Sequence, residues 1–306
     1  VFLLNQIIHF IVGTFSLFQI LFSNFNLLNT AYKLPYSLFY NISSENCLPN
    51  NTIRGKLNYS LIDWYLNIST TKKLNIIKIF HNKKILKDFL YKEKKIEFKK
   101  NLFPGLGIIA SIIFIFHSIF LIFFSFFAIF LGKWYFPLLL KDSILRAYIK
   151  YCKKELLPKQ YLFDNSNFVY RPLWTYEAEK KGSEIVCYFF STNCREIEHG
   201  LKDSTIGWGY GAMNWSIYYV WDDYQKKFVE DMSIYKKKII PCGPIYFLDK
   251  EIILNKQKKK IITVFDILPR RESVIRSRIE PIYYYDKNTV CKFLKDIVDL
   301  SEKLDF

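Results

Sequence analysis

Polar side chains gather directly after three of the predicted strands in the second half of the chain. These strands cover residues 184–190, 216–221 and 261–265. The polar residues that follow them are Ser191, Thr192 and Asn193, then Asp222 and Asp223, and then Asp266, Arg270 and Arg271. In open α/β sheets, ligands bind beyond the carboxyl ends of the strands. The pattern therefore predicts a ligand site built from these residues.

The neighbouring carboxylates Asp222 and Asp223 are the best candidates for a general base. Two adjacent carboxylates can raise each other's pKa, and a base works best when its pKa lies near the operating pH. The alternative is structural, because an Asp that follows a strand can cap the next helix. His199 lies in a polar loop, where it is either a base or simply exposed.

The other polar residues have chemistry suited to binding. The Ser191–Asn193 segment could hydrogen-bond substrate hydroxyl groups or could form a turn. Arg270 and Arg271 could pair bidentately with phosphate, or form a solvated surface pair. The loop at residues 207–211 could shape a subsite, although no strand directly precedes it, as a phosphate-binding fingerprint requires. No His, Cys and Asp cluster has metal-ligand spacing, so we expect neither a metal nor a cofactor.

Strands and helices alternate from about residue 142 onward. Helices are predicted for residues 143–156, 171–181, 222–232 and 289–304, and strands for residues 167–170, 184–190, 216–221, 238–247 and 261–265. Gly182 is expected to cap the second of these helices. Such alternation predicts an α/β fold with a parallel sheet covered by helices on both faces, as in Rossmann-type units. The Lys-rich stretch 250–260 is expected to separate two units.

An apolar run covers residues 107–131, which are 25 positions without a formal charge. At about 1.5 Å per residue this run exceeds the roughly 30 Å of a bilayer core, so it predicts a membrane segment. Basic residues flank it on both sides, which leaves open a single crossing or a hairpin that continues through residues 136–140. Residues 1–28 are also uncharged and predict either a membrane helix or a packed helix. Residues 76–90 show helical spacing.

The net charge is +16, with 44 Lys and Arg against 28 Asp and Glu. Lys outnumbers Arg 36 to 8, a ratio that is typical of the codon bias of an AT-rich genome and does not indicate a nucleic-acid-binding module. Residues 1–103 hold 14 Lys and Arg against 5 Asp and Glu, so the excess fits a membrane surface better than a nucleic acid. The 51% hydrophobic content excludes a disordered chain.

A series of motifs resembles one family of bacterial proteins over residues 142–306. The motifs are Arg171-Pro-Leu-Trp-Thr-Tyr-Glu-Ala-Glu179 with Gly182, Tyr188-Phe-Phe-Ser-Thr-Asn193, Met213-Asn-Trp215, Val220-Trp-Asp-Asp-Tyr-Gln225, Gly243-Pro-Ile-Tyr-Phe247 and Val264-Phe-Asp-Ile-Leu-Pro-Arg270. In this order they resemble the surface-polysaccharide biosynthesis proteins named after a Pro-Phe-Thr-Ser motif. That motif itself does not occur in these residues, and the resemblance predicts it downstream of Phe306.

The resemblance implies a metal-independent glycosyltransferase of GT-B type at the inner (cytoplasmic) membrane, with its catalytic domain in the cytoplasm. It would take a nucleotide sugar and a glycan or lipid-linked acceptor, for capsule or lipopolysaccharide. Residues 1–103 would precede a membrane segment at 104–140. Residues 141–249 would form an acceptor unit that includes Asn214 as a binding residue, and residues 250–306 would form the start of a donor unit. A polyol-phosphate transferase and a non-catalytic, membrane-tethered scaffold remain alternatives.

Overall fold

The computed structural model of the protein describes residues 2–25, 35–42, 48, 60–68, 76–80, 87–99, 103–165, 168, 170–190, 213–232, 237–245 and 287–303. The chain divides into two compact units, residues 1–248 and 249–306. In the second unit the described part is helix α9, Lys287–Lys303, which matches the helix predicted at residues 289–304. The predicted strand at 261–265 and the Lys-rich stretch 250–260 lie outside the described residues.

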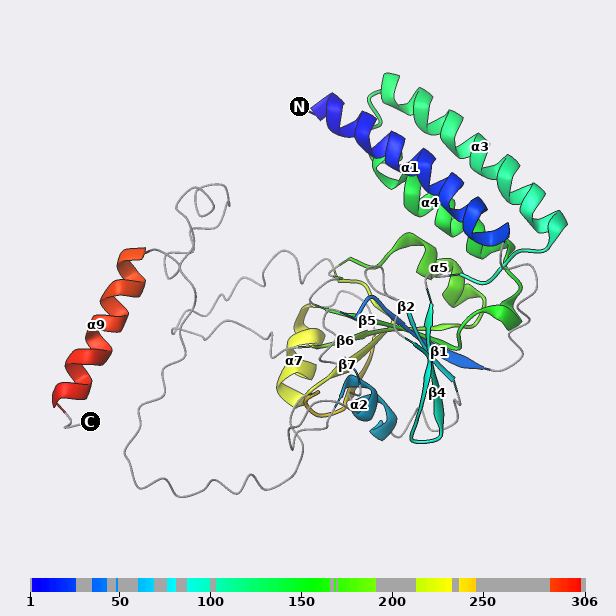
Figure 1. Ribbon diagram of the computed structural model, residues 1–306. Coiled ribbons are helices and arrows are strands. Elements are labelled where there is room, and N and C mark those ends of the chain that lie inside the picture. The colour runs from blue at the N-terminus through cyan, green and yellow to red at the C-terminus, as the bar shows by residue number, and fades with distance from the viewer. Residues whose placement is uncertain are drawn as a thin grey trace. The chain divides into compact units, whose positions relative to one another are not determined.

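The first unit is built on an eight-stranded sheet (Figure 1). In spatial order the strands are β3 (Phe89–Tyr91), β4 (Lys94–Lys99), β2 (Ile76–Phe80), β1 (Tyr36–Tyr40), β5 (Gln160–Asp164), β6 (Glu184–Tyr188), β7 (Ile217–Val220) and β8 (Lys238–Pro241). Strand β3 runs antiparallel to β4, and every other neighbouring pair is parallel. The prediction of an α/β fold with a largely parallel sheet is therefore confirmed.

The strand order reverses between β1 and β5. From β1 the chain builds outward through β2 and β4, and it then returns to the other side of β1 to add β5, β6, β7 and β8. A reversal of this kind opens a crevice at the carboxyl ends of the two central strands, because their connections leave in opposite directions. By this rule we expect the crevice where β1 ends at Tyr40 and β5 ends at Asp164.

The sheet begins much earlier in the chain than the predicted alternation of strands and helices. Strand β2 occupies Ile76–Phe80, within the stretch whose spacing predicted a helix, so that prediction was wrong. Its β-branched residues Ile77 and Ile79 are fully buried on one face. On the other face Lys78 is buried opposite Glu97 of β4, with its amine 3.6 Å from the centre of the Tyr36 ring. The buried Lys78 interrupts the row of isoleucines, so the apolar residues of this strand recur at a helix-like spacing. In so short an apolar run, periodicity alone does not distinguish a strand from a helix.

Several elements of the second half lie where the sequence predicted them. They are α5 (Leu173–Lys180), β6, β7 and α7 (Asp223–Met232). Gly182 has a φ of +94° and follows the end of α5. Its backbone N–H donates to the carbonyl of Glu179, and the backbone N–H of Ser183 donates to the carbonyl of Ala178. Within the predicted strand at 167–170, the described residues Phe168 and Tyr170 are not in a strand, and β5 lies at Gln160–Asp164 instead. The helix predicted at 143–156 begins earlier, as α4 (Tyr135–Tyr151).

Aromatic side chains fill the core on both faces of the sheet. On one face Tyr161 and Phe163 pack beneath α4 and α5, where Trp174 of α5 is buried. On the other face Leu162 and Tyr188 pack with Trp64 of helix α2 (Leu61–Asn67). This two-sided cover holds the ends of the central strands in fixed positions.

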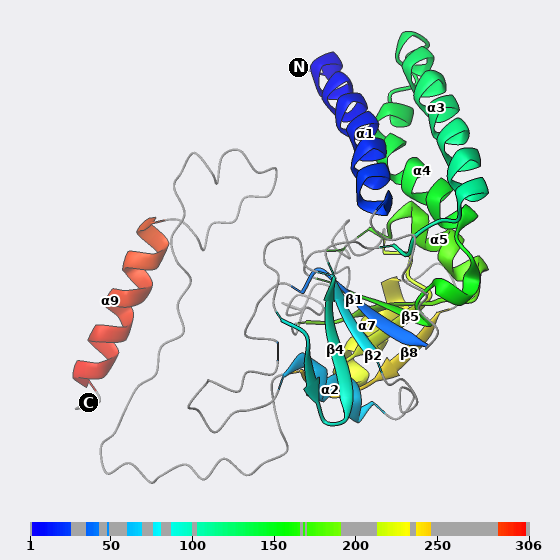
Figure 2. The same cartoon turned by 45° about the vertical axis from the view of Figure 1, so that its right-hand side comes forward.

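Three helices form a bundle beside the sheet (Figures 1 and 2). They are α1 (Phe2–Phe25), α3 (Ile108–Phe130) and α4, and α4 contacts both of the others. Both α1 and α3 are long and apolar enough to cross a membrane, judged by length and composition. The ring of Phe10 packs against Phe126, so α1 is also a packed helix, and each of the two expectations for residues 1–28 has support.

Candidate active site

Aromatic rings pack together at the switch point between β1 and β5. Tyr40, the last residue of β1, stacks on Phe163 of β5 with ring centres 5.0 Å apart. The next residue, Asn41, has a φ of +54° and donates its backbone N–H to the carbonyl of Phe80. This left-handed residue turns the chain sharply as it leaves β1, because Asn tolerates that conformation better than most residues.

Two polar residues end β5 on the other side of the crevice. Asp164 is fully buried, and the buried Asn165 follows it. The Asn165 side-chain oxygen accepts a hydrogen bond from the backbone N–H of Phe190 at 2.8 Å. The backbone N–H of Asn165 donates to the carbonyl of Tyr188. Among the described residues, the side-chain NH₂ of Asn165 has no hydrogen-bond partner. A buried donor without a partner is costly, so this group suits an oxygen acceptor on a ligand.

A second carboxyl group, on helix α4, lies near Tyr40 at the end of β1. Asp142 accepts a hydrogen bond from the backbone N–H of Leu173, at the start of α5. Burial raises the pKa of Asp142. Burial, helped by the negative charge of Asp142, raises the pKa of Tyr40 to about 12. A carboxyl group with a raised pKa is suited to accept a proton near neutral pH.

Cys187, in the central strand β6, is poorly suited to act as a nucleophile. Burial, and to a smaller extent the charge of Asp164, raise the pKa of its thiol well above the usual value. The reactive form of cysteine is the thiolate, which such surroundings disfavour. We therefore assign Cys187 to the core.

The two predicted general bases, Asp222 and Asp223, lie at the end of β7. The Asp222 side chain accepts a hydrogen bond from the backbone N–H of Gln225 at 2.8 Å, so it caps α7. Asp223 lies in the first turn of α7, and both carboxylates are exposed. The capping alternative therefore holds for Asp222, while a catalytic role for either residue remains a prediction.

Asn214 lies at the opposite end of β7 from these two carboxylates. It precedes the strand, whereas Asp222 follows it, and its side chain donates to the hydroxyl of Tyr176. The structure thus separates Asn214 from Asp222 and Asp223. The other predicted site residues lie outside the described residues: Ser191, Thr192, Asn193, Asp266, Arg270 and Arg271, together with His199 and the 207–211 loop.

Asp142, Asp164 and Asn165 did not emerge from the sequence analysis as site residues. The signal for the last two was present, because the segment Gln160-Tyr-Leu-Phe-Asp-Asn165 is an apolar strand that ends in polar residues. The strand was predicted seven residues too late, so the rule of the carboxyl ends was not applied to it. Asp142 carries no local signal, because its role depends on a contact with α5.

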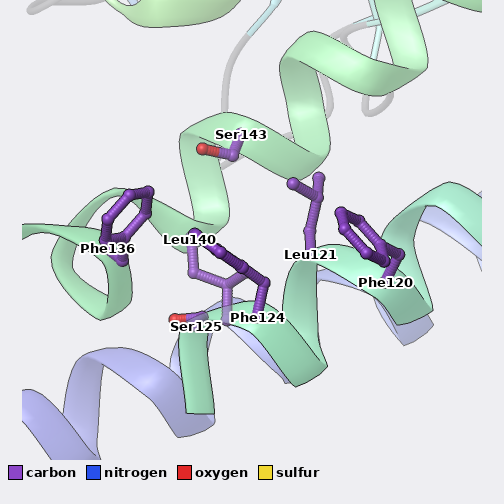
Figure 3. Close-up of a pocket in the computed structure, with 7 residues that line it drawn as sticks. All are labelled: Phe120, Leu121, Phe124, Ser125, Phe136, Leu140 and Ser143. Atoms are coloured by element: carbon purple, nitrogen blue, oxygen red, sulfur yellow. The ribbon is translucent and has the colours of Figure 1, made fainter. Parts of the chain in front are cut away.

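A groove runs between α3 and α4 (Figure 3). Its volume is about 210 Å³, and its lining is apolar apart from Ser125 and Ser143. The hydroxyl of Ser125 is buried and has no hydrogen-bond partner among the described residues. Ser143 lines the groove, whereas the half-buried Asp142 beside it in the sequence is not a lining residue and contacts α5 instead.

Comparison with known proteins yields one family. A family model described as polysaccharide biosynthesis PFTS motif protein matches residues 120–305. No curated protein and no solved structure matches the chain. The matched region starts within α3 and takes in α4 and the half of the sheet from β5 to β8, which confirms the resemblance seen in the motifs. The chain therefore belongs to the family of polysaccharide biosynthesis PFTS motif proteins.

Proposed function

We propose that this protein is a membrane-associated glycosyltransferase that moves a sugar from a nucleotide sugar to an acceptor of a bacterial surface polysaccharide. The observation that carries the proposal is the pair of buried polar residues Asp164 and Asn165 at the switch point of the sheet. Ligand sites of open α/β sheets lie at this position. The family adds the polysaccharide setting, since fold alone does not define function.

The strand order supports a first unit of Rossmann type, as a GT-B enzyme requires on its acceptor side. In that arrangement the nucleotide sugar would bind to the second unit, from about residue 250 onward. Arg270 and Arg271 would then pair with the diphosphate and stabilise the charge that develops on it. No metal is needed for this step.

The reaction needs a base beside the acceptor. The acceptor hydroxyl oxygen forms a bond to the anomeric carbon, the bond from that carbon to the diphosphate breaks, and the hydroxyl proton passes to a carboxylate. Asp142 is the strongest candidate for this carboxylate because burial raises its pKa. Asp222 and Asp223 stay as further candidates at the end of β7. The buried NH₂ of Asn165, which has no partner among the residues that the structure describes, would hold an acceptor oxygen in place.

The groove between α3 and α4 favours a lipid-linked acceptor over a free glycan. Its apolar lining would take a hydrocarbon chain, since Ser125 and Ser143 are the only polar residues among those that line it. The variant Ser125→Leu fills this groove. We expect it to slow transfer to a long-chain acceptor about tenfold, which corresponds to about 1.4 kcal/mol, and to leave transfer to a chain-free acceptor unchanged.

The central test uses the full-length protein in lipid nanodiscs, with a panel of nucleotide sugars and a lipid-linked saccharide. We expect release of the nucleotide and a gain of one sugar mass on the acceptor. A gain of a polyol phosphate instead would replace the proposal with the polyol-phosphate transferase. Absence of any transfer, combined with stable binding to other enzymes of polysaccharide assembly, would establish a scaffold.

A further inference from the structure

Both ends of the α3–α4 hairpin are anchored in the same sheet. Strand β4 precedes α3 and strand β5 follows α4, and the two belong to one sheet with β2 and β1 between them. A sheet lies on one side of a membrane. If α3 crossed a bilayer, α4 would therefore have to cross back, so a single crossing is excluded by the connection alone.

The returning helix α4 is too short outside the sheet domain to cross a membrane. Asp142 already bonds to the N–H of Leu173, and one turn later the Arg146 guanidinium lies 3.4 Å from the Glu177 carboxylate of α5. Only residues 135–141 of α4 extend beyond this contact with α5. They rise about 10 Å, whereas a crossing needs about 30 Å.

The outgoing helix α3 is tied to α4 over its first half. Phe114 packs edge-on against Tyr148, and the His117 ring lies 2.9 Å from the hydroxyl of Tyr151. Further along, Phe124 packs against Phe136 near the start of α4. Only the second half of α3, about ten residues and 15 Å long, therefore lies beside the free part of α4.

Helix α1 runs alongside the same free end. Phe2 packs against Trp134 in the connection between α3 and α4, and Gly13 lies against Leu140 of α4. The beginning of α1 is therefore level with the α3–α4 connection, and its later turns approach the sheet. The described part of α1 thus adds no crossing that would lead away from the sheet.

The outer faces of α1 and α3 are mostly apolar and carry no formal charge, with Asn5, His9 and Gln19 as exposed polar residues of α1. Neither helix contains a Lys, Arg, Asp or Glu, and their exposed side chains include Phe15, Phe18, Phe116, Phe123 and Phe127. Lys133, Trp134 and Tyr135 stand at the far end, and this combination of basic and aromatic residues is typical of the lipid head-group region. Two charged residues of α4, Asp142 and Arg146, contact α5.

We infer that the bundle of α1, α3 and α4 enters one leaflet of a lipid bilayer without crossing it. The outer faces of α1 and α3 lie among the acyl chains, and Lys133, Trp134 and Tyr135 lie at the head groups of that same leaflet. The inference rests on the membrane association proposed above and specifies its mode. The sheet, its crevice and the tip of the hairpin are then on one side of the membrane.

Thiol labelling tests the sidedness of the tip. The variants Lys133→Cys at the tip and Glu155→Cys near the sheet receive a membrane-impermeant maleimide, in inside-out vesicles and in right-side-out spheroplasts. Mass spectrometry of the peptides separates these sites from the native cysteines. We expect both sites to react in the same one of the two preparations. Reaction of position 133 only in the opposite preparation would show a crossing hairpin and overturn the inference.

Vesicle flotation tests the membrane-facing surface. We expect Phe127→Lys to lower the fraction of protein that floats with liposomes at least fivefold. The matched control Leu90→Lys, at an exposed apolar residue on β3, should float like the unchanged protein. If the unchanged protein does not float at all, membrane association itself fails. If it floats and Phe127→Lys has no effect, the assigned surface is wrong although association stands.

Discussion

The side-chain oxygen of Asn165 accepts the backbone N–H of Phe190 at 2.8 Å, and this bond joins the ends of strands β5 and β6. The same amide keeps a buried NH₂ without a partner among the described residues. One side chain thus holds the edge of the crevice and offers a donor to it. These two roles can be separated by substitution.

The variant Asn165→Asp keeps the acceptor for Phe190 but replaces the NH₂ with an oxygen. We expect the protein to stay folded, with catalytic efficiency at least tenfold lower, because a ligand oxygen would then meet a carboxylate instead of a donor. Thermal unfolding and a transfer assay measure the two effects. Asn67→Asp, at an exposed position of α2, is the matched control. Unchanged transfer by Asn165→Asp would remove this residue from the site.

The variant Asp142→Asn tests the proposed base. It keeps an oxygen for the N–H of Leu173 but cannot take a proton. We expect transfer to fall at least a hundredfold, and the rise of activity with pH through the raised pKa of Asp142 to disappear. Measured pH–rate profiles of both proteins decide this. A profile that keeps the same rising limb would assign it to another group, with Asp223→Asn as the next variant to examine.

Stability should follow the same group with a defined sign. Burial raises the pKa of Asp142, so the folded state holds its proton more tightly than the unfolded state does. Its contribution to stability is therefore full below the unfolded pKa and is lost as the pH rises through the folded pKa. Asp142→Asn should lose less stability than the unchanged protein over this rise, as measured by thermal unfolding between pH 4 and pH 8.

Asp222 offers a test of its structural role. Asp222→Ala removes the side chain that accepts from Gln225 at the start of α7, and we expect a loss of about 1 kcal/mol in unfolding free energy. Asp222→Ser keeps a capping oxygen and should recover most of it. Denaturant unfolding of the three proteins gives the comparison. Equal loss in both variants would mean that the charge, rather than the cap, stabilises α7.

Gly13 allows the approach of α1 to α4. A Cβ at this position would lie 2.8 Å from the Cγ of the buried Leu140. We expect Gly13→Val to destabilise the bundle by about 1–3 kcal/mol, because the added side chain overpacks the contact. Leu140→Ala in the same chain should restore part of the loss. Gly107→Ala is the control, since nothing lies within 4 Å of a Cβ there.

The sequence was sufficient for elements whose signals are local. The segment from Arg171 to Gly182 has a proline before the helix and a glycine after it, and the structure has α5 and its cap there. The apolar run at residues 184–188 likewise became β6. Strand β5 was misplaced because Phe168 and Tyr170 continue the apolar pattern beyond Asp164 without belonging to a strand.

The parts that the sequence missed depend on contacts between distant residues. The segment of β2 forms a strand because Ile77 and Ile79 are buried in the core there and Lys78 pairs with Glu97 across the neighbouring strand β4. Asp142 becomes a site residue only through Leu173, which lies 31 positions away. Asn214 lies at the amino end of the strands because β7 begins after it, and a short motif does not reveal where that strand begins.

Two parallel strands that follow each other in the chain need a connection that returns the chain to the starting edge of the sheet. Here the connection from β4 back to β5 contains the whole α3–α4 hairpin, and α4 itself makes the return. The apolar portion of the hairpin is therefore an extension of a link that the fold would require in any case. Replacing residues 121–140 with a short polar turn, together with removal of α1, would keep every strand in its order and offers a route to a water-soluble form of the sheet domain for crystallisation.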